Sequence, residues 1–92
     1  MKPYTRRHEL NYLYEAAERL HRANKVDFAL CNSVTNTVYH YNLRPEILQA
    51  VNLLTFWAIF GAPGRSELLE LADSTGPRGL AAVAWLRAQR QP

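Results

Sequence analysis

The chain has 92 residues, enough for one domain with a single hydrophobic core and too few for two. Its composition is 48% hydrophobic and 21% charged, with 4 Gly and 5 Pro, which excludes collagen, low-complexity disorder and a coiled-coil rod. The net charge of +3 makes the chain only mildly basic. We therefore expect residues 1–92 to form one domain.

The first predicted element is an amphipathic helix over residues 5–23. Leu13 and Leu20 belong to an apolar stripe at helical spacing. Charged residues, Glu9 among them, are expected on the opposite, solvent-facing side. His21 falls on the apolar stripe, where a hydrogen-bonded core histidine is favoured over a metal ligand.

The pattern changes over residues 26–42. Apolar and polar residues alternate at its start, a polar turn follows at 32–36, and β-branched and aromatic residues come after the turn. This pattern predicts a β-hairpin. In the preferred register Tyr39 and Tyr41 lie on the face with the larger apolar area, and a slip of one residue would put His40 there instead.

The next helix is predicted over residues 45–60, because Pro45 suits the first helical position and Gly61 with Pro63 ends the helix. Its apolar residues wrap most of the helix circumference. Such a helix is either central in the domain or lies with one face against another chain. Because a domain of this size struggles to cover a helix on every side, the pattern indicates an oligomer or a partner.

Two further helices are predicted over 67–74 and 78–89, with Ser66 as the N-cap of the first. The turn between them is similar to the centre of a helix-turn-helix. The last helix, however, offers Arg78 and few other side chains that read base edges, and the helix before it is acidic, so an ordinary helical hairpin is favoured. The predicted fold is therefore α+β, a small helix–β-hairpin–helices domain in the order α-β-β-α-α-α, with the hydrophobic 45–60 helix at its centre.

Positive charge is concentrated at the two ends of the chain. Residues 1–25 and 77–92 each carry a net charge of +3, whereas residues 26–76 carry −3. Arg6 and Arg7 stand beside aromatic residues, a combination that suits single-stranded nucleic acid. The same arginines could instead meet acidic groups on a protein.

Catalytic and metal-binding chemistry is disfavoured by the residues present. Cys31 and His40 would be diagonal neighbours on the hairpin, as a nucleophile and its base require, but no acid stands ready to orient the histidine. The three histidines fall on different elements or faces, which disfavours a metal site. We therefore expect no enzyme activity, no cofactor and no metal.

Cysteine usage and hydropathy bear on the compartment. Cys31 is the only cysteine, so no internal disulfide can form, which favours a reducing, cytoplasmic setting. No apolar signal core follows the basic first residues, and the apolar stretch over 47–60 is too short to span a bilayer.

An uncharged hairpin with two free edges and nearby aromatic residues is a surface that pairs readily with another protein. We therefore expect a small non-catalytic regulator, inhibitor or adaptor, of a type common among accessory proteins of bacteria and phages. It would act by occluding a protein partner, and it would form a homodimer through the hairpin or the central helix. The alternative is a DNA-binding transcriptional regulator with basic N- and C-terminal helices. The residues expected to bind the protein partner are Cys31, Tyr39, His40 and Tyr41 on the hairpin and Arg6, Arg7, Arg19 and Arg22 on the first helix.

Overall fold

The computed structural model describes the backbone of residues 6–40 and 43–90 and the side chains of residues 7–37 and 43–90. Within these ranges the protein is all-helical, with five helices and no strand. The helices are α1 (Arg6–Arg22), α2 (Phe28–His40), α3 (Pro45–Phe60), α4 (Arg65–Ala72) and α5 (Pro77–Gln89).

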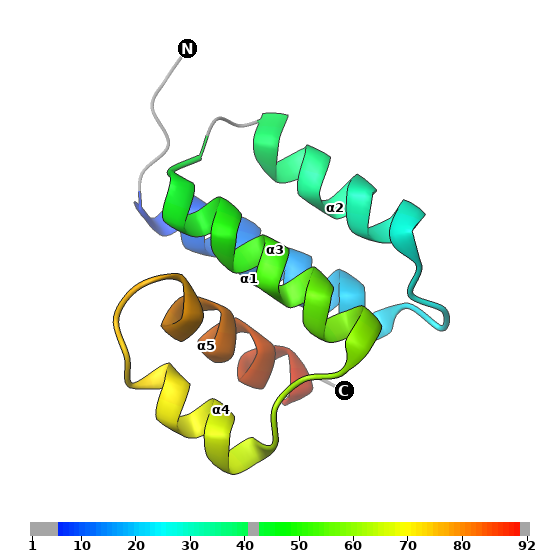
Figure 1. The fold of residues 1–92 in the computed structure, drawn as a ribbon. Coiled ribbons are helices and arrows are strands. Elements are labelled where there is room, and N and C mark those ends of the chain that lie inside the picture. Colours follow the sequence, from blue (N-terminus) through cyan, green and yellow to red (C-terminus); the bar gives the residue numbers. More distant parts are fainter. Residues whose placement is uncertain (1–5, 41–42, 91–92) are drawn as a thin grey trace.

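Helix α3 lies at the centre of the arrangement (Figure 1). It packs against α1, α2 and α5, and α1 also contacts α2 and α5. The α2 and α5 helices lie on opposite sides of the α1–α3 pair, and α4 is the outermost element, beyond α5. Among the described residues α4 packs on α5 alone, so one side of α3 has no helix over it.

The predicted β-hairpin is wrong, and with it the α+β fold class: the segment is helix α2 followed by a connection to α3. Asp27 starts the helix, because its Oδ1 accepts a hydrogen bond of 2.9 Å from the backbone N–H of Leu30, as an N-cap does. Cys31 and Val34, three residues apart, are buried, whereas Asn32, Ser33, Asn36 and Thr37 are exposed. A helix satisfies its own backbone hydrogen bonds, whereas an isolated two-stranded hairpin is at best marginally stable in water.

The helix also separates residues that the hairpin would have brought together. Cys31 and His40 are nine positions apart on α2, which corresponds to about 13 Å along the helix axis. They are therefore not the diagonal neighbours expected from the hairpin register. Tyr39 is near the end of α2, and Tyr41 lies outside the described residues.

The other four predicted helices are confirmed to within a few residues. Helix α4 begins earlier than expected, at Arg65, and its N-cap is Gly64 rather than Ser66. The α4–α5 turn carries Gly76 at a φ of 89°, a conformation that residues other than glycine rarely adopt. The turn after α4 packs so closely on α5 at Gly79 that a Cβ there would collide with the backbone carbonyl of Ser74.

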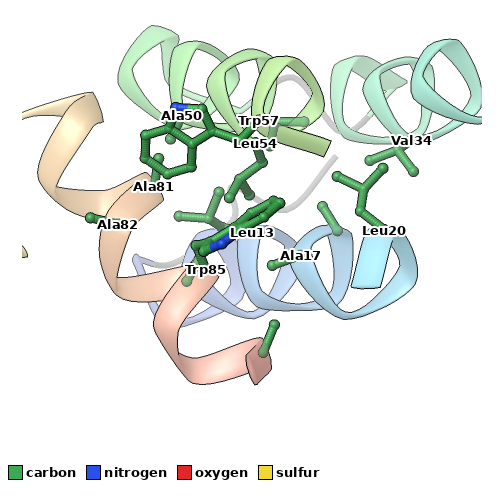
Figure 2. Packing of buried hydrophobic residues seen from close by; sticks show 14 of the residues in the cluster. Leu13, Ala17, Leu20, Val34, Ala50, Leu54, Trp57, Ala81, Ala82 and Trp85 are labelled. Atoms are coloured by element: carbon green, nitrogen blue, oxygen red, sulfur yellow. The ribbon is translucent and has the colours of Figure 1, made fainter. Parts of the chain in front are cut away.

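The core is built around two tryptophans (Figure 2). The rings of Trp57 on α3 and Trp85 on α5 meet edge to face, with centroids 5.7 Å apart. Leu13 of α1 and Leu54 of α3 are fully buried beside them. Alanines on α5 (Ala81, Ala82, Ala84 and Ala88) bring the backbone of that helix close to its neighbours.

An ion pair joins the start of α1 to the start of α3. Glu9 is 4% exposed, and its carboxylate accepts hydrogen bonds from Arg44 Nε at 2.8 Å and from the backbone N–H of Arg44 at 3.1 Å. Arg44 is the N-cap of α3 and makes no cap of its own, so the Glu9 carboxylate supplies an acceptor and a negative charge at the positive end of the helix dipole. The expectation that Glu9 faces solvent is therefore wrong: Glu9 lies four residues before Leu13 and continues the buried stripe of α1.

We expect Glu9→Ala to lower the free energy of unfolding by about 1–3 kcal/mol, because it removes charge-assisted hydrogen bonds from a buried site. The matched control is Glu18→Ala, which removes the exposed 2.9 Å pair between Glu18 and Arg22 within α1 and is expected to cost roughly 0.5 kcal/mol or less. Denaturant unfolding of both variants measures the difference. Equal losses for the two variants would contradict a role for Glu9 in fixing α3.

Candidate protein-binding surface

The basic residues expected to meet a partner are spread along α1 from its first turn to its last. Arg7, Arg19 and Arg22 are exposed, and Arg22 is paired with Glu18. Arg19 borders a small groove of about 30 Å³ between α1 and α2, away from the α5 side of α1. Arg6 begins α1, and its side chain is outside the described ones.

Of the residues expected on the hairpin, Cys31 is the one whose side chain lies in the described part of the chain. Cys31 is buried against α3, where its thiol lies 3.9 Å from the carbonyl oxygen of Thr55. Burial, helped by the negative charge of Asp27, raises the pKa of the Cys31 thiol, which opposes formation of a nucleophilic thiolate. The side chains of Tyr39 and His40, and all of Tyr41, fall outside the described part of the chain, so their partner-binding role stays a prediction.

Two neighbouring exposed aromatic residues lie on α3. Phe56 and Phe60 are 54% and 65% exposed, and their rings lie 4.8 Å apart on consecutive turns. On the other side of α3, the side chains of Ile47, Leu54 and Trp57 are buried in the core. These two phenylalanines therefore form an apolar ridge that the fold does not cover.

An open groove runs beside this ridge. Its volume is about 730 Å³, and it lies between α3, the end of α4 and the start of α5. The lining residues are Gln49, Asn52, Leu53, Phe56, Leu71, Ser74, Thr75, Pro77 and Arg78. We call it the Phe56 groove; it exists because α4 packs on α5 and leaves the neighbouring side of α3 open.

The chemistry of the Phe56 groove is apolar with one cation. Leu53, Phe56, Leu71 and Pro77 supply the apolar surface, amides and hydroxyls supply hydrogen-bonding groups, and Arg78 is the only lining residue with a formal charge. This combination suits a ligand with an apolar stripe and a carboxylate.

The sequence predicted an excess of aromatic residues and placed the partner-binding surface on the hairpin segment, and that placement stays a prediction. The exposed α3 surface also has a signal in the sequence. The buried stripe of α3 already contains Ile47, Val51 and Leu54, and a second stripe of Leu53, Phe56 and Phe60 follows the same helical spacing on another side. Only the packing of α4 decides that this second stripe stays open.

In the described part of the chain no three His, Cys, Asp or Glu side chains are grouped to hold a metal ion. None of the described helices is both long and apolar enough to cross a membrane.

Comparison with known proteins found no matching protein family, no matching curated protein and no matching solved structure.

The sequence predicted a hydrogen-bonded core histidine at His21, and the structure agrees with this only in part. His21 is partly buried as expected, with its ring centroid 4.4 Å from that of Trp85, but its Nε2 has no hydrogen-bond partner in the described part of the chain. Burial lowers the pKa of His21, so the folded protein favours the neutral ring.

Because the unfolded chain then binds more protons than the folded one, we expect the contribution of His21 to stability to be complete above its ordinary pKa of 6.5 and to fall as the pH drops below that value. The free energy of unfolding, measured from pH 7.5 to 5, should therefore decrease more in the wild type than in His21→Phe. The variant keeps a ring against Trp85 and retains the other histidines, so the difference between the two profiles isolates His21. Parallel profiles would contradict this account.

Proposed function

We propose that this protein is a non-catalytic protein-binding module that takes an amphipathic helix of another protein into the Phe56 groove. The observation that carries the proposal is the exposed Phe56–Phe60 ridge beside an open apolar groove, on a helix whose other side is core. Single exposed apolar residues are normal on a protein surface, but two adjoining aromatic rings at the edge of a groove are typical of a binding site.

A helical ligand fits the shape and the chemistry of the groove. In helix-in-groove recognition, the partner presents apolar side chains at positions i, i+3 or i+4, and i+7. Here α3 forms one wall and the α4–α5 turn forms the other, so such a stripe can contact Phe56 and Leu71 together. A glutamate or aspartate beside the stripe can then pair with Arg78, because the guanidinium binds carboxylates in a bidentate geometry.

The energetics favour the phenylalanines as the main contacts. Full burial of a Phe side chain is worth about 1.5–3 kcal/mol, and the two rings start more than half exposed. Arginine and aromatic residues, phenylalanine included, are also enriched at protein interfaces. Occlusion of the partner's helix is the mode of action that we propose, as a regulator, inhibitor or adaptor would use.

The charge of α4 favours protein binding over DNA binding. In a helix-turn-helix the second helix must place exposed side chains in the major groove. Helix α5 would be that second helix, and it exposes Arg78, Val83, Arg87 and Gln89. The helix before it exposes Glu67 and Glu70, which would repel the phosphate backbone, and binding through the arginines would weaken steeply as the salt concentration rises.

The test is selection from a displayed library of helical 16-residue peptides with varied apolar and charged positions. We expect the protein to enrich peptides with apolar residues at i, i+4 and i+7 and an adjacent acid. Phe56→Asp should weaken the binding of these peptides at least tenfold. The Arg78→Glu variant should enrich peptides that carry a lysine in place of the acid. Phe28→Asp is the matched control, because Phe28 is 69% exposed on α2, outside the groove, and its loss should leave affinity unchanged.

Fluorescence polarisation measures these affinities, and circular dichroism checks that each variant is folded. Failure to enrich such peptides, or equal affinity for the wild type and Phe56→Asp, would overturn the proposal. Binding of duplex DNA at low salt with a steep salt dependence, together with no peptide enrichment, would favour the nucleic-acid alternative.

A further inference from the structure

A second open surface lies along α5. A hollow of about 540 Å³ is lined by Ala72 of α4 and by Val83, Leu86, Arg87 and Arg90 of α5. We call it the Arg87 hollow, and it shares no described lining residue with the Phe56 groove. Among its described lining residues are two arginines and no acidic side chain. The hollow therefore combines positive charge with aliphatic surface.

A third arginine lies at the basic end of this hollow. Helices α4 and α5 run in opposite directions, so the start of α4 lies toward the end of α5 (Figure 1). Arg65, in the first turn of α4, is therefore at the same end as Arg87 and Arg90. Helical spacing puts Arg65 and the exposed Leu69 on the same side of α4 as Ala72. Three arginines thus surround one end of an aliphatic surface.

These three arginines are not neutralised within the described part of the chain. Arg22 and Arg44 each contact a glutamate of this chain. By contrast, Arg65, Arg87 and Arg90 are exposed, and no described acidic side chain lies within ion-pair distance of them. A guanidinium binds a carboxylate through two parallel N–H···O hydrogen bonds. The basic end can therefore take carboxylates from outside the chain.

Arg87 is already oriented for such a contact. Its guanidinium lies 4.3 Å from the centroid of the Tyr14 ring on α1, a cation–π contact that restricts the side chain. A side chain that is held before the ligand arrives loses less conformational entropy on binding. The edge of the guanidinium stays available for a carboxylate, because Arg87 is exposed.

Two acidic residues of α4 limit which anions can cover the hollow. Asp73 follows Ala72, at the opposite end of α4 from Arg65. Glu70 is exposed about 100° around α4 from Leu69, so it lies outside the side of α4 that borders the hollow. A short anionic ligand reaches the arginines without approaching either carboxylate, whereas a long polyanion or an anionic membrane that covers α4 is repelled by both. Charge therefore selects a short acidic ligand.

We propose that the Arg87 hollow binds a short acidic segment of another protein, in which two or three carboxylates adjoin an aliphatic side chain. The carboxylates pair with Arg65, Arg87 and Arg90, and the aliphatic side chain packs on Val83 and Leu86. This site goes beyond the proposed function and does not depend on it, because the Phe56 groove stays open. A partner that carries both an amphipathic helix and an acidic segment would gain avidity by using both surfaces.

The lining of the hollow favours a peptide over a nucleic acid. Proteins that bind single strands stack the bases on aromatic side chains, and no described residue that lines the hollow is aromatic. The Tyr14 ring nearby already has Arg87 over one face. Val83 and Leu86 instead offer aliphatic surface, whose burial against a leucine or valine side chain is favourable.

Fluorescence polarisation of the full chain with a labelled peptide, Gly-Leu-Val-Glu-Glu-Glu-Gly, tests the proposal. We expect a Kd below about 1 mM at low salt. A peptide with glutamine in place of glutamate, and one with serine in place of leucine and valine, should each bind more weakly. These two comparisons measure the contributions of charge and of aliphatic contact separately.

Variants of the arginines locate the site. Arg65→Gln with Arg90→Gln keeps the contact between Arg87 and Tyr14 and should weaken the glutamate peptide about tenfold, because it removes two charged partners. Arg19→Gln with Lys25→Gln is the matched control: it removes the same charge from exposed positions outside the hollow and should leave affinity unchanged.

Charge reversal gives a gain of binding that unfolding cannot imitate. The Arg65→Glu/Arg90→Glu variant should prefer a peptide with lysine in place of glutamate. Circular dichroism checks the folding of every variant. Phe56→Asp should bind the glutamate peptide as the wild type does, which separates this site from the Phe56 groove and its failure from failure of the proposed function.

Four results would overturn the proposal. One is no binding at about 1 mM peptide, and another is an equal loss in the arginine variant and its matched control. The third is chemical-shift changes, in an isotope-labelled chain, at the amides of Leu53 and Phe56 rather than at those of Val83 and Leu86. The fourth is tighter binding of a thymidine oligonucleotide than of the glutamate peptide at the hollow, which would assign the site to nucleic acid.

Discussion

The apolar circumference of α3 is the constraint on which the rest of the structure depends. An apolar helix of this kind needs other elements packed against every side. Helices α1, α2 and α5 cover three sides of α3. The Trp57–Trp85 contact joins α3 to α5, Cys31 and Val34 lie in the part of α2 that is buried, and the Glu9–Arg44 pair fixes the start of α3 on α1. Because α4 packs on α5, the fourth side of α3 remains open, and the Phe56 groove is the result.

Four of the five helices could be predicted from the sequence, because each combines a clear boundary signal with helical spacing. Pro45 and Gly61 bound α3, and Gly76 with Pro77 separates α4 from α5. Helix α2 could not be predicted in this way. Its valine and threonine residues favour strands, and a short run such as Val26 to Leu30 does not separate a period of two from one of 3.6. The N-cap Asp27 and the spacing of Cys31 and Val34 were the signals that outweighed β-propensity.

The candidate surface was predictable in kind but not in place. The sequence holds more apolar and aromatic surface than a small core readily encloses, and Phe56 with Phe60 is where part of the excess lies exposed. Tertiary packing decides which side of an apolar helix stays uncovered. No local pattern in the sequence of α3 predicts where α4 packs. Glu9 shows the same limit, since a buried carboxylate is identified only when Arg44 is found beside it.

The central claim is that the open side of α3 contributes little to folding and is free for a partner. Denaturant unfolding of the double variant Phe56→Ser/Phe60→Ser, compared with Leu54→Ala, tests it most directly. The account predicts a change within about 1 kcal/mol for the double variant, because both rings are mostly exposed, and a loss of about 2–5 kcal/mol for Leu54→Ala, which removes a fully buried side chain. A loss in the double variant as large as that of Leu54→Ala would show that the two phenylalanines belong to the core, and it would contradict the account.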